Sequence, residues 1–377
     1  MDHFDVIVCG LGATGSAALQ ALARRHCRVL GLEQFTPSHD RGSSHGATRI
    51  IRLSYFEHPS YVTLLRRAYV LWREFERAAG RQLLHVTGIA EIGPPDGILV
   101  KGTLAAARLH ALAHDVMPAG DFTRRFPAFR LPSEMVAVLQ PDGGYLNAEP
   151  AVRAQIELAR QAGAEIRSGT KVRAIEPRGT GVRVVTEQGA VDAGVAIVAA
   201  GPWLGPLLPR LALPLRATRQ VMGWFAPAMP ELFPPNFPVF MIESRHGIHY
   251  GFPPAAAGVK AAKHHHADET VEPDSFDRAV SARDEALIRP ALSDHLPAAD
   301  GKLLAAKTCL YTMAPDGDFI IDRVAECPQI LVASPCSGHG FKFAPVIGEA
   351  LAELALDGST GHDISRFRLA RFSSRRA

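Results

Sequence analysis

The N-terminal stretch alternates between short apolar runs and a helix-forming segment. Residues 4–9 (FDVIVC) are an apolar run that predicts a buried strand, and residues 27–32 (CRVLGL) predict a second one. Between them, residues 16–25 (SAALQALARR) have the composition of a helix. A strand, a helix and a strand in this order are typical of the start of a parallel sheet.

Two longer helices are expected further along the chain. Residues Tyr61–Ala79 place their apolar side chains on one stripe at spacings of three and four, which predicts an amphipathic helix. Residues 149–162 predict another helix, with Asn147 as its N-cap and Gly163 at its end. Strands are expected at residues 165–167, 182–186 and 195–199.

The composition and the hydrophobic pattern of the chain change between residues 216 and 304. Prolines cluster there, and alternating apolar and polar positions predict strands around residues 221–225 and 247–252. This pattern predicts an inserted, mostly antiparallel domain, and a helix over residues 348–356 closes the chain. A length of 377 residues also favours two domains over one core.

Composition narrows the class of protein. The net charge is +3 and the basic residues are scattered, which does not favour nucleic-acid binding. Five cysteines without a CxxC pair argue against a disulfide framework or a structural zinc site, so a reducing, cytoplasmic location is expected. A strand that begins by residue 4 leaves no room for a signal peptide, and no apolar run reaches the ~18 residues of a membrane span.

The turn after the first strand carries a nucleotide-binding pattern. Gly10, Gly12 and Gly15 form G-x-G-x-x-G between a strand and a helix, which lets a pyrophosphate approach the backbone and the helix start. Glu33 ends the second strand, where a carboxylate can bind ribose hydroxyls and would repel the 2′-phosphate of NADP. The pattern predicts a dinucleotide but does not separate FAD from NAD, and a glycine turn that only serves packing is the alternative.

Four further motifs resemble one family. They are HGATRIIR at residues 45–52, KTCLYT at 307–312, SGHGFKF at 337–343 and GHDIS at 361–365. In this order and at these intervals they resemble the monomeric sarcosine oxidase and N-methyltryptophan oxidase family of flavoproteins, over residues 3 to about 370.

The resemblance implies an α/β (α+β) fold, with a Rossmann-type FAD-binding domain and an inserted, mostly antiparallel sheet substrate domain. Both domains are expected to be discontinuous. The expected limits are residues 1–85, 148–216 and 306–377 for the FAD-binding domain, and 86–147 and 217–305 for the substrate domain.

The resemblance also implies the chemistry. FAD would be attached to Cys309 through an 8α-S-cysteinyl bond, and a monomer would oxidise the C–N bond of an N-methyl or cyclic secondary amino acid. O₂ would accept the electrons, giving H₂O₂ and an imine that hydrolyses. Three alternatives stay open: a flavin dehydrogenase that passes electrons to a carrier, an NAD-dependent enzyme, and a nucleotide-binding module without activity.

Site residues follow from the same motifs. The resemblance gives Arg52 and Lys342 the substrate carboxylate, and a guanidinium can bind a carboxylate in a two-point fork. The resemblance places Lys260 and His264 beside the flavin, with Lys260 assisting O₂, and it places Tyr250 and Tyr311 along the cavity. The expected cofactor-binding residues are Gly10, Gly12, Gly15, Glu33, His45, Thr48, Arg49, Gly201, Cys309, Gly338, His339 and Gly340.

Each of these residues could also have a purely structural role, without binding a cofactor or substrate. The arginines could form surface ion pairs, residues 260–266 could be a solvated basic loop, and Cys309, His339 and the tyrosines could simply pack. No metal site is expected, because neighbouring side chains in the run His264–His266 point in different directions. Cys336, and the small residues at 255–262, depart from the family and leave the identity of the amine open.

Overall fold

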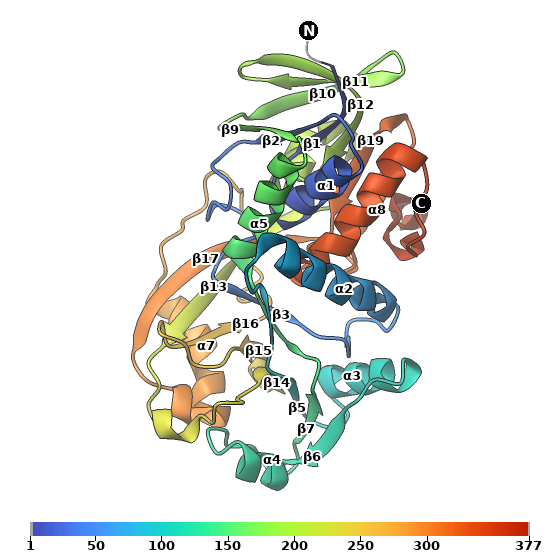
Figure 1. Ribbon diagram of the computed structural model, residues 1–377. Coiled ribbons are helices and arrows are strands. Elements are labelled where there is room, and N and C mark those ends of the chain that lie inside the picture. The colour runs from blue at the N-terminus through green and yellow to red at the C-terminus, as the bar shows by residue number, and fades with distance from the viewer. Residues whose placement is uncertain (1–2, 376–377) are drawn as a thin grey trace.

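The computed structural model describes residues 3–375 and contains two large sheets, one above the other in Figure 1. The upper sheet has eight strands, and four of its pairings are parallel: β1 with β2 and β12, β2 with β9, and β12 with β19. Its strands are β10 (Val172–Arg178), β11 (Gly181–Thr186), β12 (Gly189–Val198), β1 (His3–Cys9), β2 (Val29–Glu33), β9 (Glu165–Ser168), β19 (Cys327–Ser334) and β18 (Ile320–Val324).

Four helices pack beside this sheet. They are α1 (Ala13–Arg24), α2 (Tyr61–Ala79), α5 (Ala148–Gln161) and α8 (Ala344–Asp357). Helix α1 lies between α5 and α8 and contacts both. Gly348 of α8 permits this approach, because a Cβ atom there would lie 2.6 Å from the carbonyl carbon of Ala17.

The lower sheet also has eight strands and is antiparallel except where β14 pairs with β5. In spatial order these strands are β17 (Leu303–Met313), β13 (Arg216–Phe225), β16 (Val259–Lys263), β15 (Gly247–Gly251), β14 (Val239–Ser244), β5 (Ile89–Gly93), β7 (Val136–Gln140) and β6 (Asp115–Pro118). A third, smaller sheet lies between the two large ones and consists of β3 (Thr48–Ile51), β8 (Gly144–Asn147) and β4 (Leu84–Val86).

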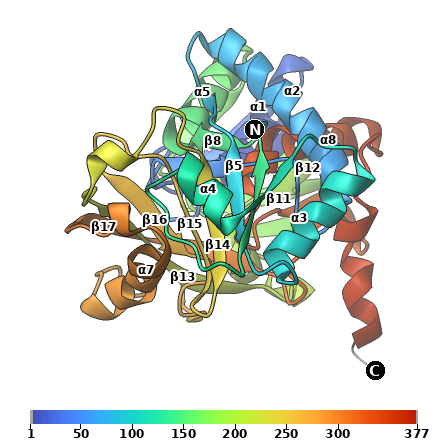
Figure 2. The ribbon, with the colours of Figure 1, turned by 90° about the horizontal axis from the view of Figure 1, so that it is seen from below.

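The helices of the lower half cover different faces of its sheet. Phe122 of α4 (Ala119–Arg125) and Leu292 of α7 (Ala282–His295) pack in one core with Phe225 and Phe240. Leu99 of α3 (Ile98–Leu109) packs in another core, with Met241 and its neighbours. The view from below shows α3 and α7 on opposite sides of the molecule (Figure 2).

The fold class predicted from the sequence is confirmed, and several element bounds need small corrections. Helix α2 has the predicted bounds, α5 begins one residue earlier, and α8 begins at Ala344. Asn147 is the N-cap of α5, but its side chain makes no capping hydrogen bond and lies 2.9 Å from His85 Nε2 instead. Strand β17 crosses the expected domain limit at residue 306 and pairs with β13 along its length, while the domain limits themselves stay a prediction.

The described residues contain no helix that is both long and apolar enough to cross a membrane.

Candidate active site

A cavity of about 410 Å³ lies between the two large sheets. Residues of the glycine-rich turn and of the strand ends beside it line one part, among them Gly10, Gly12, Glu33 and Gly201. Ten more of the predicted site residues also line it: Arg49, Arg52, Tyr250, His264, Cys309, Tyr311, Gly338, His339, Gly340 and Lys342. Gly15, His45, Thr48 and Lys260 are not among the lining residues.

The glycine-rich turn is built as its pattern predicts. Gly10 has φ +90°, and a Cβ atom there would lie 2.7 Å from the carbonyl oxygen of Ala199. At Gly15 a Cβ atom would lie 1.8 Å from the Gly10 oxygen, so Gly15 serves the close packing of helix and strand. Gly12 is the N-cap of α1, and the next N–H, of Ala13, points to the Ser44 hydroxyl at 3.0 Å. The helix start therefore faces the cavity, where it favours an anion.

Glu33 closes this end of the cavity. It is buried, and its two carboxylate oxygens accept hydrogen bonds from the N–H groups of Leu11 (2.9 Å) and Phe35 (3.0 Å). These bonds fix the carboxylate beside the turn, and its contact with a ribose stays a prediction.

One face of the lower sheet supplies the opposite wall. Tyr250 of β15 pairs with Met241 of β14, and both line the cavity, as do Cys309 and Tyr311 of β17. Cys309 is buried beside Met222 and Trp224, and burial raises the pKa of its thiol. Burial also raises the pKa of Tyr311 well above its usual range, with Tyr250 and Cys309 adding to the effect.

Lys260 is buried on the same sheet, behind the segment that carries Arg49. Its ammonium group donates to the carbonyl oxygens of Gly46 (2.6 Å) and Thr48 (2.8 Å) and lies 4.6 Å from the Phe252 ring centre. Burial, followed by the charge of Arg49, lowers the pKa of Lys260 well below its usual value. Arg49 itself donates to the carbonyl oxygens of Thr48 and Ser43, each at 2.9 Å.

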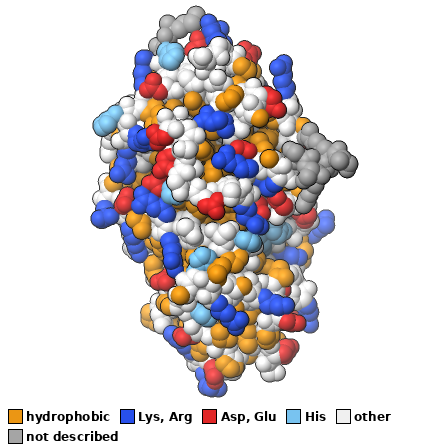
Figure 3. All heavy atoms as spheres, turned by 90° about the vertical axis from the view of Figure 1, so that its right-hand side faces the viewer, with side chains coloured by type: hydrophobic (Ala, Val, Ile, Leu, Met, Phe, Trp, Pro, Cys, Tyr) orange, Lys and Arg blue, Asp and Glu red, His pale blue; other side chains and the backbone are white. Residues whose placement is uncertain are grey.

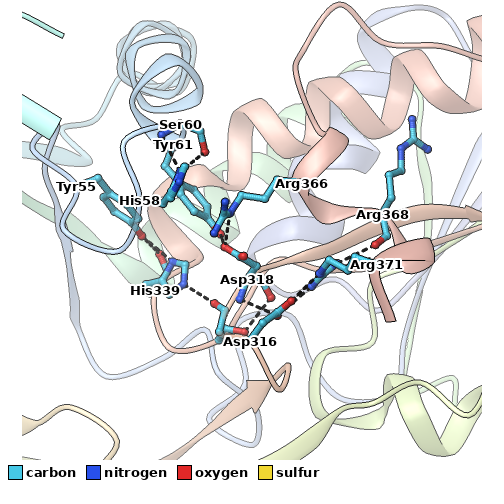
Figure 4. A network of polar contacts seen from close by, with 12 residues as sticks. Tyr55, His58, Ser60, Tyr61, Asp316, Asp318, His339, Arg366, Arg368 and Arg371 are labelled. Atoms are coloured by element: carbon cyan, nitrogen blue, oxygen red, sulfur yellow. Dashed lines mark hydrogen bonds and ion pairs between the residues drawn. The ribbon is translucent and has the colours of Figure 1, made fainter. Parts of the chain in front are cut away.

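Tyr55, which the sequence did not single out, contacts both His339 and Lys342. Figure 4 shows its hydroxyl directed at the His339 ring. Lys342 donates to the His339 carbonyl oxygen at 2.7 Å and to the Tyr55 hydroxyl at 3.4 Å. His339 Nε2 lies 3.0 Å from the Gly317 carbonyl oxygen and must donate there, so Nδ1 accepts from the Tyr55 hydroxyl at 2.6 Å. Burial lowers the pKa of His339 to about 4, and burial and Arg52 lower that of Lys342 to about 7.

Arg52 is buried and has two carboxylate partners that sequence reasoning missed. Its Nη2 atom lies 2.6 Å from Glu57, which lines the cavity, and its Nε atom lies 3.0 Å from Glu91. Burial acts to raise the pKa of Glu57, but Arg52 reverses this and the net pKa is below the usual value. A signal for Glu91 was present, because it is the one charged residue of the otherwise apolar strand Ile89–Gly93.

The rings of His264 and His265 lie 3.9 Å apart and both are near the Tyr311 ring. The expectation that neighbouring side chains in this run point in different directions is therefore wrong for this pair and holds for His266. His264 lines the cavity with its ring 5.8 Å from that of Tyr311, whereas His266 Nε2 lies 3.0 Å from Asp284. Within residues 3–375, no group of three or more His, Cys, Asp or Glu side chains could hold a metal ion.

Comparison with known proteins gives the family. The family described as DAO, FAD dependent oxidoreductase, matches residues 5–354. Monomeric sarcosine oxidase of Streptomyces avermitilis is 40% identical over 370 residues, covering 97% of this chain and 96% of that protein. N-methyl-L-tryptophan oxidase of Yersinia pestis is 35% identical over 373 residues, covering 98% and 99%. The chain belongs to the FAD-dependent oxidoreductase family.

A solved structure agrees with this result. The open form of NikD, an amino acid oxidase essential for nikkomycin biosynthesis, superposes with a TM-score of 0.86 at 29% identity, covering 98% of each chain. The resemblance predicted from the four motifs is therefore confirmed, and the chain is an oxidoreductase that uses FAD.

The polar groups around the cavity fit an FAD-dependent oxidoreductase. His45 is only 1% exposed, and neither ring nitrogen has a hydrogen-bond partner among the described residues. The hydroxyl groups of Ser43 and Ser334, which both line the cavity, are buried and unpartnered in the same way. Since buried polar groups are normally paired, the two serine hydroxyl groups are available to the polar edges of a bound FAD, whereas His45 does not line the cavity.

Proposed function

We propose that this protein is an amino acid oxidase that uses FAD to oxidise the C–N bond of a small secondary amino acid. The observation that carries the proposal is that Arg52 and Lys342 face the same cavity as Cys309 and the glycine-rich turn. The charged groups of Arg52 and Lys342 lie 4.4 Å and 5.1 Å from the centre of one ring, that of Tyr55, and two basic groups placed in this way fit a carboxylate. The neighbouring wall of Tyr250, Tyr311 and Met241 fits a small, largely apolar amine.

The residues of this chain bind and orient the substrate. Arg52 and Lys342 hold the carboxylate, while the rings of Tyr250 and Tyr311 exclude water from the C–H and N–H that react. FAD, when bound, would supply the two-electron redox chemistry that links the substrate to O₂. The substrate loses two electrons and two protons and becomes an imine, and O₂ takes up two of each to give H₂O₂.

A panel of amino acids tests this reaction. Secondary amino acids with an N-methyl group or a small ring should consume O₂ and release H₂O₂ in equal amounts. Matching amines without the carboxylate should react far more slowly. Reduction of a dye without O₂ uptake would show a dehydrogenase instead, and turnover independent of the carboxylate would remove the role given to Arg52 and Lys342.

The FAD is, in our proposal, attached covalently to Cys309. This thiol is buried and lines the cavity, in the K-T-C-L-Y-T segment that resembles the attachment segment of the family. Acid-precipitated wild-type protein should stay yellow, whereas Cys309→Ser should release its flavin into the supernatant. Cys336→Ser is the matched control, because Cys336 lines the same cavity and should leave the attachment intact. Wild-type flavin found in the supernatant would contradict the linkage.

We also propose a cytoplasmic monomer. None of the five cysteines, which all lie within the described part of the chain, is paired in a disulfide, which fits a reducing compartment. On the face shown in Figure 3, basic and acidic side chains are intermingled, which does not favour a nucleic-acid partner.

A further inference from the structure

Glu91 lies directly behind the cavity, on the strand β5. It is 0% exposed, and its cross-strand neighbour is Met241 of β14, whose own neighbour is Tyr250 of β15. Residues that are paired across strands point to the same face of a sheet. Because Met241 and Tyr250 line the cavity, the carboxylate of Glu91 points to the cavity side as well.

This carboxylate holds one edge of the Arg52 guanidinium. Its Oε1 atom accepts from Arg52 Nε at 3.0 Å, and its Oε2 atom has no hydrogen-bond partner among the described residues. The rings of Tyr55 and Phe56 lie 4.4 Å and 5.0 Å from the guanidinium carbon. Glu91 binds the Nε atom of Arg52, and the cavity-lining Glu57 binds its Nη2 atom. The edge of the guanidinium that carries the Nη atoms therefore faces the cavity.

The neighbouring strand fixes the backbone that carries Arg52. Gln140 of β7 accepts, through one side-chain oxygen, hydrogen bonds from the N–H groups of Leu53 and Ser54, each at 3.1 Å. Gln140 is 0% exposed and pairs with Ile89, two residues before Glu91. Strand β5 therefore holds the side chain of Arg52 through Glu91. The adjacent strand β7 holds the backbone just after Arg52 through Gln140.

We propose that Glu91 is a positioning residue for Arg52: it orients the guanidinium and offsets its charge, and so limits how tightly the cavity holds a carboxylate. This inference rests on the proposed function, in which Arg52 binds the substrate carboxylate. Without Glu91, only Glu57 would balance the buried guanidinium, so the cavity would bind any carboxylate more strongly, including that of the product. Release of the product limits turnover in many enzymes, so a tempered affinity favours repeated turnover.

The substitution Glu91→Gln separates charge from shape, because the amide oxygen can still accept from Arg52 Nε. Acetate, a carboxylate without an amine, serves as the probe, and its Kd is measured from the change in flavin absorbance. The variant should bind acetate on the order of tenfold more tightly than wild type. Its KM for the amino acid should fall while kcat does not rise, a split that a merely structural role would not produce.

Two further variants keep the test decisive. Glu349→Gln removes a carboxylate from the Arg67 ion pair outside the cavity and should leave the acetate Kd unchanged. Glu91→Asp keeps the charge, so its acetate Kd should stay close to that of wild type even if Glu91→Gln folds poorly. Tenfold tighter binding by Glu91→Asp would contradict the proposal.

The outcomes also separate this inference from the proposed function. If wild type binds acetate and folded, flavin-loaded Glu91→Gln binds it equally or more weakly, the role of Glu91 is wrong and the proposed function stands. If wild type oxidises amines but does not bind acetate at all, the role of Arg52 fails, and the inference fails with it.

Discussion

Two groups in the candidate site, Lys342 and Glu91, have pKa values near neutrality, and in the proposed function both affect the binding of one carboxylate. Burial and Arg52 lower the pKa of Lys342 to about 7, while burial raises that of Glu91 to about 7 against the opposing effect of Arg52. As pH rises through this value, Lys342 loses its positive charge and Glu91 gains a negative one. Both changes weaken the attraction for a carboxylate.

We therefore expect the affinity for acetate to fall as pH rises from about 6 to about 9. For each of the two groups, the acetate Kd should rise roughly tenfold for every unit by which bound acetate raises the pKa of that group. Titrations of flavin absorbance at each pH measure it. Lys342→Met should keep only the part that belongs to Glu91, and Glu91→Gln only the part that belongs to Lys342. An acetate Kd that stays constant over this range would contradict the assignment.

We propose a separate role for Lys260, in the reaction with O₂. Electron transfer to O₂ creates an anion where none stood before, and a nearby cation stabilises it, more so in a dry site. The Gly46 and Thr48 oxygens hold the Lys260 nitrogen in one place, and an anion formed beside it would oppose the lowering of its pKa by burial.

Lys260→Met should slow reoxidation of the reduced enzyme by at least ~100-fold, equivalent to about 2.7 kcal/mol. Reduction by substrate without O₂ should change much less, since the substrate carboxylate is held elsewhere. Stopped-flow measurements of the two half-reactions separate these effects. Fast reoxidation in the variant would leave Lys260 with a packing role and make Arg49 the next cation to test.

At the scale of elements, the close contact of α1 and α8 depends on a single glycine. A Cβ atom at Gly348 would lie 2.6 Å from the Ala17 carbonyl carbon and 2.7 Å from the Ala17 Cβ. Gly348→Ala should force the helices apart and cost about 1–3 kcal/mol, more than the ~1 kcal/mol that alanine gains in a helix.

Thermal unfolding of the flavin-loaded protein measures this cost as a lower Tm. Gly205→Ala in α6 (Leu204–Leu207) is the matched control, because a Cβ atom there meets nothing within 4 Å. The control should unfold at or above the wild-type temperature. An unchanged Tm for Gly348→Ala would mean that the two helices can separate without loss.

Local sequence patterns predicted the helices and strands well, but they did not predict which strands pair. The stripe of apolar residues in Tyr61–Ala79 gave the bounds of α2, and the glycine-rich turn was readable because strand, turn and helix are contiguous. The pairing of β17 with β13 joins segments about ninety residues apart and leaves no local sign. For that reason the sequence did not show that Cys309 lies on the same sheet as Tyr250.

At the scale of the whole molecule, the motifs predicted which residues meet in the cavity but not what holds them. Arg52 and Lys342 were predicted together from two separate motifs, and both line one cavity. Glu91 and Tyr55, which hold them, lie outside the motifs, and their contacts exist only once distant strands and loops have assembled. Fixing a cation in place is therefore a property of the complete fold.

The C-terminal segment takes part in this assembly (Figure 4). Arg366 of η6 (Ser365–Phe367) donates to Asp318 Oδ1 at 2.8 Å, and the same oxygen accepts from the Tyr61 hydroxyl at 2.8 Å. The preceding residue, Gly317, accepts the hydrogen bond from His339. Asp318 thus connects the end of the chain and α2 to the loop that supports His339.

Asp318→Asn should therefore weaken both the fold and the site. The amide oxygen can still accept both hydrogen bonds, but the charge that faces Arg366 is lost, which should cost about 1–2 kcal/mol of unfolding free energy. Because His339 holds Lys342 through its carbonyl oxygen, the variant should also bind acetate more weakly, with little change in FAD content. Urea unfolding and the acetate titration measure the two effects.

Asp357→Asn, which breaks an exposed ion pair with Arg25, is the control and should change neither. Loss of stability with an unchanged acetate Kd would show that the loop supports the fold alone and that Lys342 is held without it.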